Sequence, residues 1–174
     1  MTIYNRWRYI SASVIGTSHF ENGIACQDTS DVRICFTSQG HDVLILVVSD
    51  GAGSAKKAEV GSQLTCRLFI EELQQFVGGH GLTSKVTRND AERWVHRVIQ
   101  DISEQASMEG LALRDYACTL LAGVVGKDQA VFLQVGDGAI VISNDDRRIF
   151  WPQSGEYANT TFFISDDNAL EKMQ

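Results

Sequence analysis

The sequence contains a single proline, Pro152, among its 174 residues, and it has no low-complexity tract. Disordered linkers are usually rich in proline, serine and charge, so none is expected here. No apolar run approaches the length of a transmembrane helix, and the residues after Arg8 are too polar for the core of a signal peptide. We therefore predict one folded domain over residues 1–174, cytoplasmic and without a membrane partner.

The sequence also contains few cysteines, and fewer basic than acidic residues. None of the four cysteines forms a CxxC pair, and the histidines do not complete a zinc pattern. Cys35, Cys66 and Cys118 lie in apolar segments and are interpreted as small core residues in a reduced compartment. The net charge is −7, from 15 basic and 22 acidic residues, which argues against a nucleic-acid partner because phosphate backbones require a basic surface.

Three familiar catalytic motifs are missing. The chain has no GxSxG nucleophile turn, no CxxxxxR loop and no GxxxxGKS/T phosphate loop. These absences disfavour a serine hydrolase, a cysteine phosphatase and a P-loop nucleotidase. Any hydrolytic chemistry must then come from other groups, and acidic residues are the most numerous candidates.

The most informative stretch is Val43–Ser62, VLILVVSDGAGSAKKAEVGS. The apolar run Val43–Val48 predicts a strand that is buried on both faces. It ends at Asp50, and Gly51 lets the backbone turn sharply and bring its own carbonyl beside the carboxylate. The simpler alternative is an ordinary Asp-Gly turn that ends a strand.

The rest of the chain predicts a sheet covered by helices. Two amphipathic helices are expected, Ala58–Val77 with a stop at Gly78-Gly79, and a second from a capping box at Asn89 and Glu92 to Gly110. Each has one apolar face that must pack on a sheet. The further predicted strands are Tyr9–Ser18, Val32–Phe36, Tyr116–Val125, Ala130–Val135, Ala139–Ile142, Arg148–Trp151 and Thr160–Ser165, with a turn at Asn144-Asp145-Asp146.

Three aspartates could converge at this sheet. Asp50 and Asp137 each follow a compact apolar strand and precede glycine, and Asp28 lies in a loop after the first predicted strand. Carboxylates, the Gly51 carbonyl and water form a set of oxygen ligands, which suits Mg²⁺ or Mn²⁺ better than zinc or copper. Two such ions can polarise a phosphoryl group and produce a nucleophile from water at neutral pH.

Four segments resemble one known family, the metal-dependent Ser/Thr protein phosphatases of type 2C (the PPM family). VVSDGAGS resembles its central metal-binding motif, and ACQDTS resembles its early acidic motif, with Asp28 as the matching carboxylate. YACTLLAGVV and AVFLQVGDGAIVI resemble its paired strand and Gly-Asp turn, and GEYANTTFFIS resembles a segment of the bacterial branch. The four occur in the family's order, between Ser13 and about Ser165.

The resemblance implies an α+β fold, a four-layer α-β-β-α sandwich with a metal cleft at one end. It implies Mn²⁺ or Mg²⁺ as cofactor, two or three ions in a complete domain, with Asp28, Asp50, Gly51 and Asp137 as metal ligands. The implied reaction is hydrolysis of phosphoserine and phosphothreonine in proteins by metal-bound water. The implied partners are a phosphorylated protein substrate and a Ser/Thr kinase.

Two departures from the family concern the early motif. Gln27 stands where many members have Glu, which removes a charge from the expected ligand set. Gly23 stands where many members have an arginine that holds the substrate phosphate. His19 is the nearest candidate for this phosphate-binding role, with packing as its alternative, and Arg6 and Arg8 are candidates on weaker grounds.

A third departure concerns the C-terminal motifs. The family has two further Asp motifs that supply metal ligands, and neither is found here; Asp166-Asp167-Asn168 is interpreted as a helix cap or loop. We therefore expect a C-terminally incomplete domain with little activity, and self-association through an uncovered sheet edge. A catalytically inactive phosphatase-like regulatory or phosphoprotein-binding module remains the alternative. An unrelated structural α/β domain is a third possibility.

Overall fold

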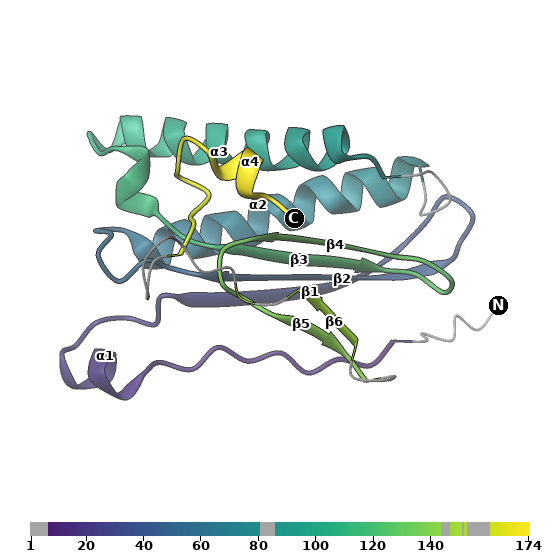
Figure 1. Cartoon of the computed structure of the whole chain (residues 1–174), viewed down its shortest axis with the longest axis horizontal. Helices are drawn as coiled ribbons and strands as arrows, with labels where there is room; N and C mark the ends of the chain where they lie inside the picture. Colours follow the sequence, from purple (N-terminus) through teal and green to yellow (C-terminus); the bar gives the residue numbers. More distant parts are fainter. Residues whose placement is uncertain (1–6, 81–85, 144–146, 151, 153–160) are drawn as a thin grey trace.

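Four antiparallel strands form the main sheet of the computed structural model, which describes residues 7–80, 86–143, 147–150, 152 and 161–174. The strands lie in the order β1-β2-β3-β4, so each pairs with its neighbour in the chain (Figure 1). Their bounds are Asp28–Phe36 for β1, Asp42–Asp50 for β2, Leu120–Val125 for β3 and Ala130–Val135 for β4. A separate two-stranded sheet pairs β5 (Ile140–Ile142) with β6 (Arg147–Phe150).

Two long helices cover one face of the main sheet (Figure 1). They are α2 (Ala58–His80) and α3 (Arg88–Met108), as the apolar periodicity predicts. The short helices are α1 (Thr17–Glu21), the 3-10 helix η1 (Leu113–Tyr116) and α4 (Ala169–Lys172). No helix in the described part of the chain is both long and apolar enough to cross a membrane.

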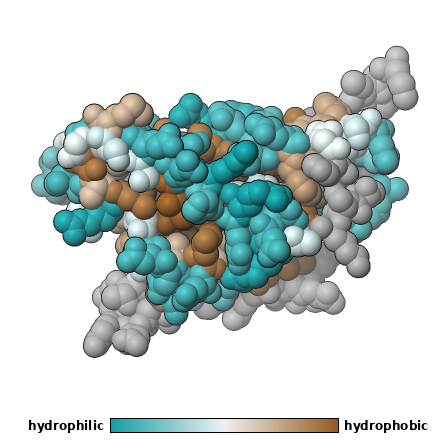
Figure 2. Space-filling model, turned by 90° about the horizontal axis from the view of Figure 1, so that it is seen from above, coloured by the Kyte–Doolittle hydropathy of each residue, from teal (hydrophilic) through white to brown (hydrophobic). Residues whose placement is uncertain are grey.

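The core lies between the helices and the sheet. Ile45 and Val47 of β2 are fully buried and belong to one apolar cluster with residues of α2 and α3. Trp94 of α3 packs edge-on against Phe69 and Phe76 of α2, with ring centroids 6.4 and 5.0 Å apart. Seen from the helix side, most of the described surface is hydrophilic, with apolar side chains between the polar ones (Figure 2).

The opposite face of the sheet is more open. Phe36 of β1 is 43% exposed on the sheet. Val48 of β2 is 44% exposed, so the prediction that the strand Val43–Val48 is buried on both faces was wrong at its end. The β5–β6 pair lies on this side, away from α2 and α3 (Figure 1). The predicted α+β architecture is confirmed, and the second sheet consists of two strands in the described part.

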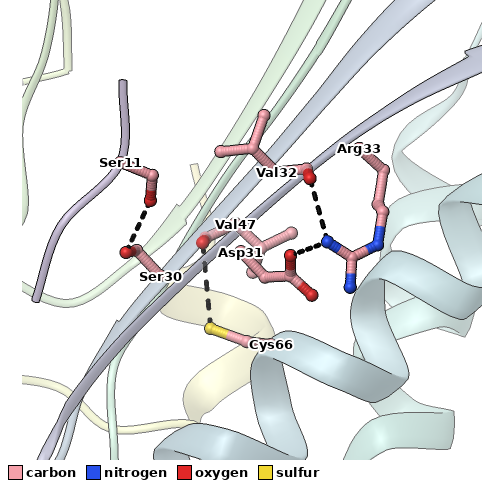
Figure 3. A network of polar contacts seen from close by, with 7 residues as sticks. All are labelled: Ser11, Ser30, Asp31, Val32, Arg33, Val47 and Cys66. Atoms are coloured by element: carbon pink, nitrogen blue, oxygen red, sulfur yellow. Dashed lines mark hydrogen bonds and ion pairs between the residues drawn. The ribbon is translucent and has the colours of Figure 1, made fainter. Parts of the chain in front are cut away.

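The N-terminal segment is not the strand that its alternating sequence predicts. Residues 7–16 form no regular element, and α1 occupies Thr17–Glu21. The Ser11 hydroxyl lies 2.7 Å from the Ser30 hydroxyl of β1 (Figure 3), and the Ser13 hydroxyl lies 3.2 Å from the same oxygen. Further along this edge strand, Arg33 pairs with Asp31 (Figure 3). The segment is therefore attached by side chains and lacks the backbone ladder of a strand.

Several predicted boundaries also move. The helix α3 is capped by Thr87 with Asp90 rather than by Asn89 with Glu92, and α2 continues through Gly78-Gly79 to His80. Residues 161–165 form no strand, β3 begins at Leu120 after η1, and β6 ends at Phe150. The predicted turn at Asn144-Asp145-Asp146 lies outside the described residues.

The chain end contacts one edge of the sheet. The backbone N–H of Gln134 donates to the Gln174 carbonyl at 3.0 Å, and the N–H of Gln174 donates back to the Gln134 carbonyl at 3.0 Å. Arg88 of α3 donates to the carbonyls of Leu170 and Met173 and so holds α4 beside the helices. The Asp166 carboxylate accepts the N–H of Phe163 at 2.9 Å, and Asn168 occupies the N-cap position of α4 without a side-chain capping bond, in line with the interpretation of Asp166-Asp167-Asn168 as a helix cap or loop.

Candidate metal centre

The antiparallel order brings distant parts of the sequence to one end of the sheet. Asp28 begins β1 and Asp50 ends β2, and the register pairs these two residues directly across the strands. Thr119 lies just before β3, and Asp137 lies two residues after β4. Because β1 and β3 start at the end where β2 and β4 finish, all four residues lie at that end (Figure 1).

The three aspartates interact electrostatically. The pKa of Asp50 is raised from 3.8 to about 6, first by partial burial, then by hydrogen bonding with Asp28 and by the negative charges of Asp28 and Asp137. Both other carboxylates therefore lie close enough to disfavour ionisation of Asp50. The structure brings together all three acidic residues that the sequence singled out.

Gly51 directly follows Asp50 and continues the strand pairing for one residue, so the sharp turn that the sequence predicted at Gly51 does not form there. Its N–H donates to the Gln27 carbonyl at 3.1 Å, and Gly51 forms a bridge with Cys118. A Cβ atom at this position would lie 2.7 Å from the Ala58 carbonyl oxygen and 2.9 Å from that of Gln27. Only glycine fits between these two backbone segments, so the backbone beside Asp50 is fixed by its surroundings.

Thr119 connects the end of β2 with the turn that contains Asp137. Its Oγ1 accepts the backbone N–H of Asp50 at 2.9 Å, and its own N–H donates to the Asp50 carbonyl at 2.8 Å. Gly136 has φ of +120°, and a Cβ there would lie 2.7 Å from the Thr119 Cγ2 atom. Thr119 was assigned no role from the sequence; its place in YACTLLAGVV, inside the predicted strand Tyr116–Val125, was the available signal.

Gln27 lies beside Gly51, the residue that follows Asp50. Its side-chain oxygen Oε1 is buried and has no hydrogen-bond partner in the described part of the structure. A buried acceptor without a donor is unfavourable and fits a place where a cation or water can bind. The donor set of carboxylates and amide oxygen matches a hard cation. Within the described residues, however, no group of three His, Cys, Asp or Glu side chains is arranged to hold a metal ion.

His19 lies on α1, which Figure 1 shows at the same end of the molecule as the aspartates. Its ring is partly exposed, and it makes no hydrogen bond or ion pair with Asp28, Asp50 or Asp137 in the described structure. Of the two weaker candidates from the sequence, Arg6 lies outside the described residues and Arg8 is exposed in the N-terminal segment. A groove of about 440 Å³ adjoins Asp28, lined by hydroxyls of Ser11 and Ser30 among other side chains.

The comparisons with known proteins identify the family. A family model described as protein phosphatase 2C matches residues 15–174. The chain belongs to the protein phosphatase 2C family. Serine/threonine-protein phosphatase 3 of Escherichia coli (strain K12) is 32% identical over 172 residues, which cover 97% of this chain and 66% of that relative.

Other relatives within this family are more distant. Serine/threonine phosphatase stp of Listeria welshimeri is 26% identical over 110 residues, 60% of this chain and 41% of that relative. A solved structure of a bacterial serine phosphatase variant superimposes with a TM-score of 0.51 at 17% identity, covering 82% of this chain and 60% of the other. That likeness shows the fold alone. This chain spans 66% and 41% of the lengths of the two relatives named by sequence.

Proposed function

We propose that the end of the sheet carrying Asp28, Asp50 and Asp137 binds Mn²⁺ or Mg²⁺, with the Gly51 carbonyl as a further ligand, and serves hydrolysis of phosphoserine and phosphothreonine in proteins. The observation that supports it most directly is the raised pKa of Asp50, about 6, which is due first to burial and then to hydrogen bonding with Asp28 and to the negative charges of Asp28 and Asp137. A divalent cation would offset this repulsion. Membership of the protein phosphatase 2C family supports the same reaction.

Each residue has a defined part in this proposal. Asp50 must be ionised to bind a cation, and the Thr119 hydroxyl fixes the Asp50 backbone through the 2.9 Å hydrogen bond. A bound divalent ion would polarise the phosphoryl group and lower the pKa of water. The groove beside Asp28 offers space for the peptide around the phosphorylated residue, and His19 on α1 is the proposed phosphate-binding residue.

We expect weak metal binding and slow hydrolysis from this 174-residue chain. Ligand number and charge set the affinity of a protein for hard cations, and the described site offers three carboxylates that do not form a ready-made set. Gln27 in place of an acidic residue lowers the charge further. These features are the argument for the second candidate function, a phosphatase-like regulatory or phosphoprotein-binding module without catalysis, whereas the family match supports the phosphatase.

Phosphate release from a phosphothreonine peptide tests the proposal. With millimolar Mn²⁺ we expect slow release that chelation stops and that Asp50→Asn abolishes, because Asp50 is the central ligand. Asp101→Asn, which removes the same charge from the exposed face of α3, is the matched control and should have no effect. Turnover that survives Asp50→Asn would contradict the proposal. Mn²⁺ and peptide binding without any turnover would favour the module.

Self-association is a separate prediction. Val48, Phe36 and Val141 are 44, 43 and 58% exposed, and they extend the apolar surface of the described chain. Exposed apolar surface and open strand edges favour association between copies. We expect dimers or larger species at high concentration, which sedimentation velocity over a concentration series would detect; a monomer throughout would contradict this.

A cytoplasmic location and a Ser/Thr kinase that phosphorylates the substrates complete the proposal.

A further inference from the structure

Gln134 is a buried polar residue in an otherwise apolar strand. It lies in β4 with 0% exposure, opposite Leu121 of β3. Its Nε2 group donates to the Gly136 carbonyl at 2.6 Å and to the Gly138 carbonyl at 2.9 Å. One side chain therefore binds the backbone on both sides of Asp137.

Burying the Gln134 amide destabilises the apolar core around it. The Gln134 Oε1 atom is buried and has no hydrogen-bond partner in the part of the chain that the structure describes. An apolar side chain of similar length would fill the same space without leaving an acceptor unpaired. Packing therefore does not explain why an amide stands at this position. Its two donated hydrogen bonds indicate that it stabilises the shape of the following turn.

The turn that follows β4 is rich in glycine. It contains two glycines, Gly136 with φ of +120° and Gly138, and glycine-rich turns can adopt many conformations. Gly136 contacts Thr119, which also holds the Asp50 backbone. Fixing the carbonyls of Gly136 and Gly138 fixes the direction in which the intervening Asp137 leaves the sheet.

We propose that Gln134 is a positioning residue that holds the Gly136–Gly138 turn so that the Asp137 carboxylate faces Asp50 in the cation site. The inference rests on the proposed function in one respect, since it takes Asp137 as a metal ligand. Gln134 itself does not contact the cation or the substrate in this proposal; it acts through the backbone of the turn.

Calorimetric titration with Mn²⁺ on the 174-residue chain tests the proposal. Gln134→Met removes both donors and keeps the length of the side chain, and we expect Mn²⁺ affinity to fall about tenfold, as for other groups that orient metal ligands. Thr65→Val is the matched control: Thr65 is also 0% exposed, and its hydroxyl contacts the Cys118 thiol rather than the turn. We expect it to leave the affinity unchanged. Equal affinity in Gln134→Met and the unmodified chain would overturn the proposal.

A double-mutant cycle separates positioning from a general structural role. If Gln134 acts through Asp137, Gln134→Met should cause no further loss of Mn²⁺ affinity in a chain that already carries Asp137→Asn. A full tenfold loss in that background would show that Gln134 acts by another route and would overturn the proposal. Gln134→Asn, which keeps the amide but shortens the side chain, provides a milder variant if Gln134→Met does not fold.

Amide hydrogen exchange in the metal-free chain keeps this proposal distinct from the proposed function. Gln134→Met or Gln134→Asn should speed exchange at residues 136–138 and leave β3 protected. If the unmodified chain binds no Mn²⁺, the metal-site proposal fails, and faster exchange in the turn still supports the positioning role. Unchanged exchange at residues 136–138 would overturn the positioning role whether or not Mn²⁺ binds.

Discussion

Replacing Asp50 by Asn is expected to weaken Mn²⁺ binding by about a hundredfold and, in the metal-free chain, to increase stability at neutral pH. The two effects have one cause. Burial, then hydrogen bonding with Asp28 and the charges of Asp28 and Asp137, hold the pKa of Asp50 at about 6, above its ordinary 3.8, so the ionised form is disfavoured in the folded state. A cation requires that ionised form, whereas the metal-free fold is destabilised by it.

The pH dependence of stability follows from the sign of this shift. The folded state binds a proton at Asp50 more tightly than the unfolded state does, so the stabilisation is complete below about pH 3.8 and is lost as the pH rises through about 6. We expect the metal-free chain to lose stability between these values, and Asp50→Asn to remove that loss. Mn²⁺ affinity should fall as the pH drops below about 6, where Asp50 becomes protonated.

Urea unfolding between pH 4 and pH 8 without metal, together with calorimetry, measures both effects. Asp101→Asn on α3 again serves as the charge-matched control and should retain the pH dependence of the unmodified chain. Equal Mn²⁺ affinity in the unmodified chain and Asp50→Asn would contradict the role of Asp50. An unaltered pH profile would show that the three carboxylates do not interact as described.

The sequence was sufficient to predict the strands that precede Asp50 and Asp137, but it placed Asp28 in a loop, whereas Asp28 begins β1. Val43–Val48 and Ala130–Val135 are compact apolar runs that end at glycine-containing turns, and both form sheet strands. The apolar periodicities of α2 and α3 are long enough to be unambiguous, and both helices form. The convergence of Asp50 and Asp137 followed from strand ends alone.

Other elements depended on partners that the sequence does not name. Tyr9–Ser18 alternates like a strand, but only side-chain hydroxyls connect residues 11 and 13 to β1, so no ladder forms. Two capping signals overlap at the start of α3, and Thr87 with Asp90 is the pair that forms. In the site, the role of Thr119 depends on the cross-strand register, and the role of Gln134 depends on where the carbonyl groups of the following turn point. Neither can be predicted from the local sequence pattern.

The turn after β4 provides the second large expected effect. Gly136→Ala should lower the free energy of unfolding by about 3 kcal/mol, since it adds a side chain both to a strained backbone position and to a filled space. The backbone has φ of +120°, and the new Cβ would lie 2.7 Å from Thr119 Cγ2 and 3.2 Å from the Phe162 carbonyl oxygen. Relief of these contacts must move the turn or Thr119, so Mn²⁺ affinity should fall as well.

Gly138→Ala is the matched control for this prediction, two residues along the same turn. A Cβ at Gly138 would lie 3.0 Å from Leu121 Cδ2, the end of a flexible side chain, and Gly138 has no positive φ. We expect a loss below about 1 kcal/mol, because Leu121 can shift and alanine restricts the unfolded chain more than glycine does. Denaturant unfolding of both variants measures the difference. Similar losses of stability for the two variants would show that the contact between Gly136 and Thr119 does not fix the turn. The turn that contains Asp137 would then be held independently of the end of β2.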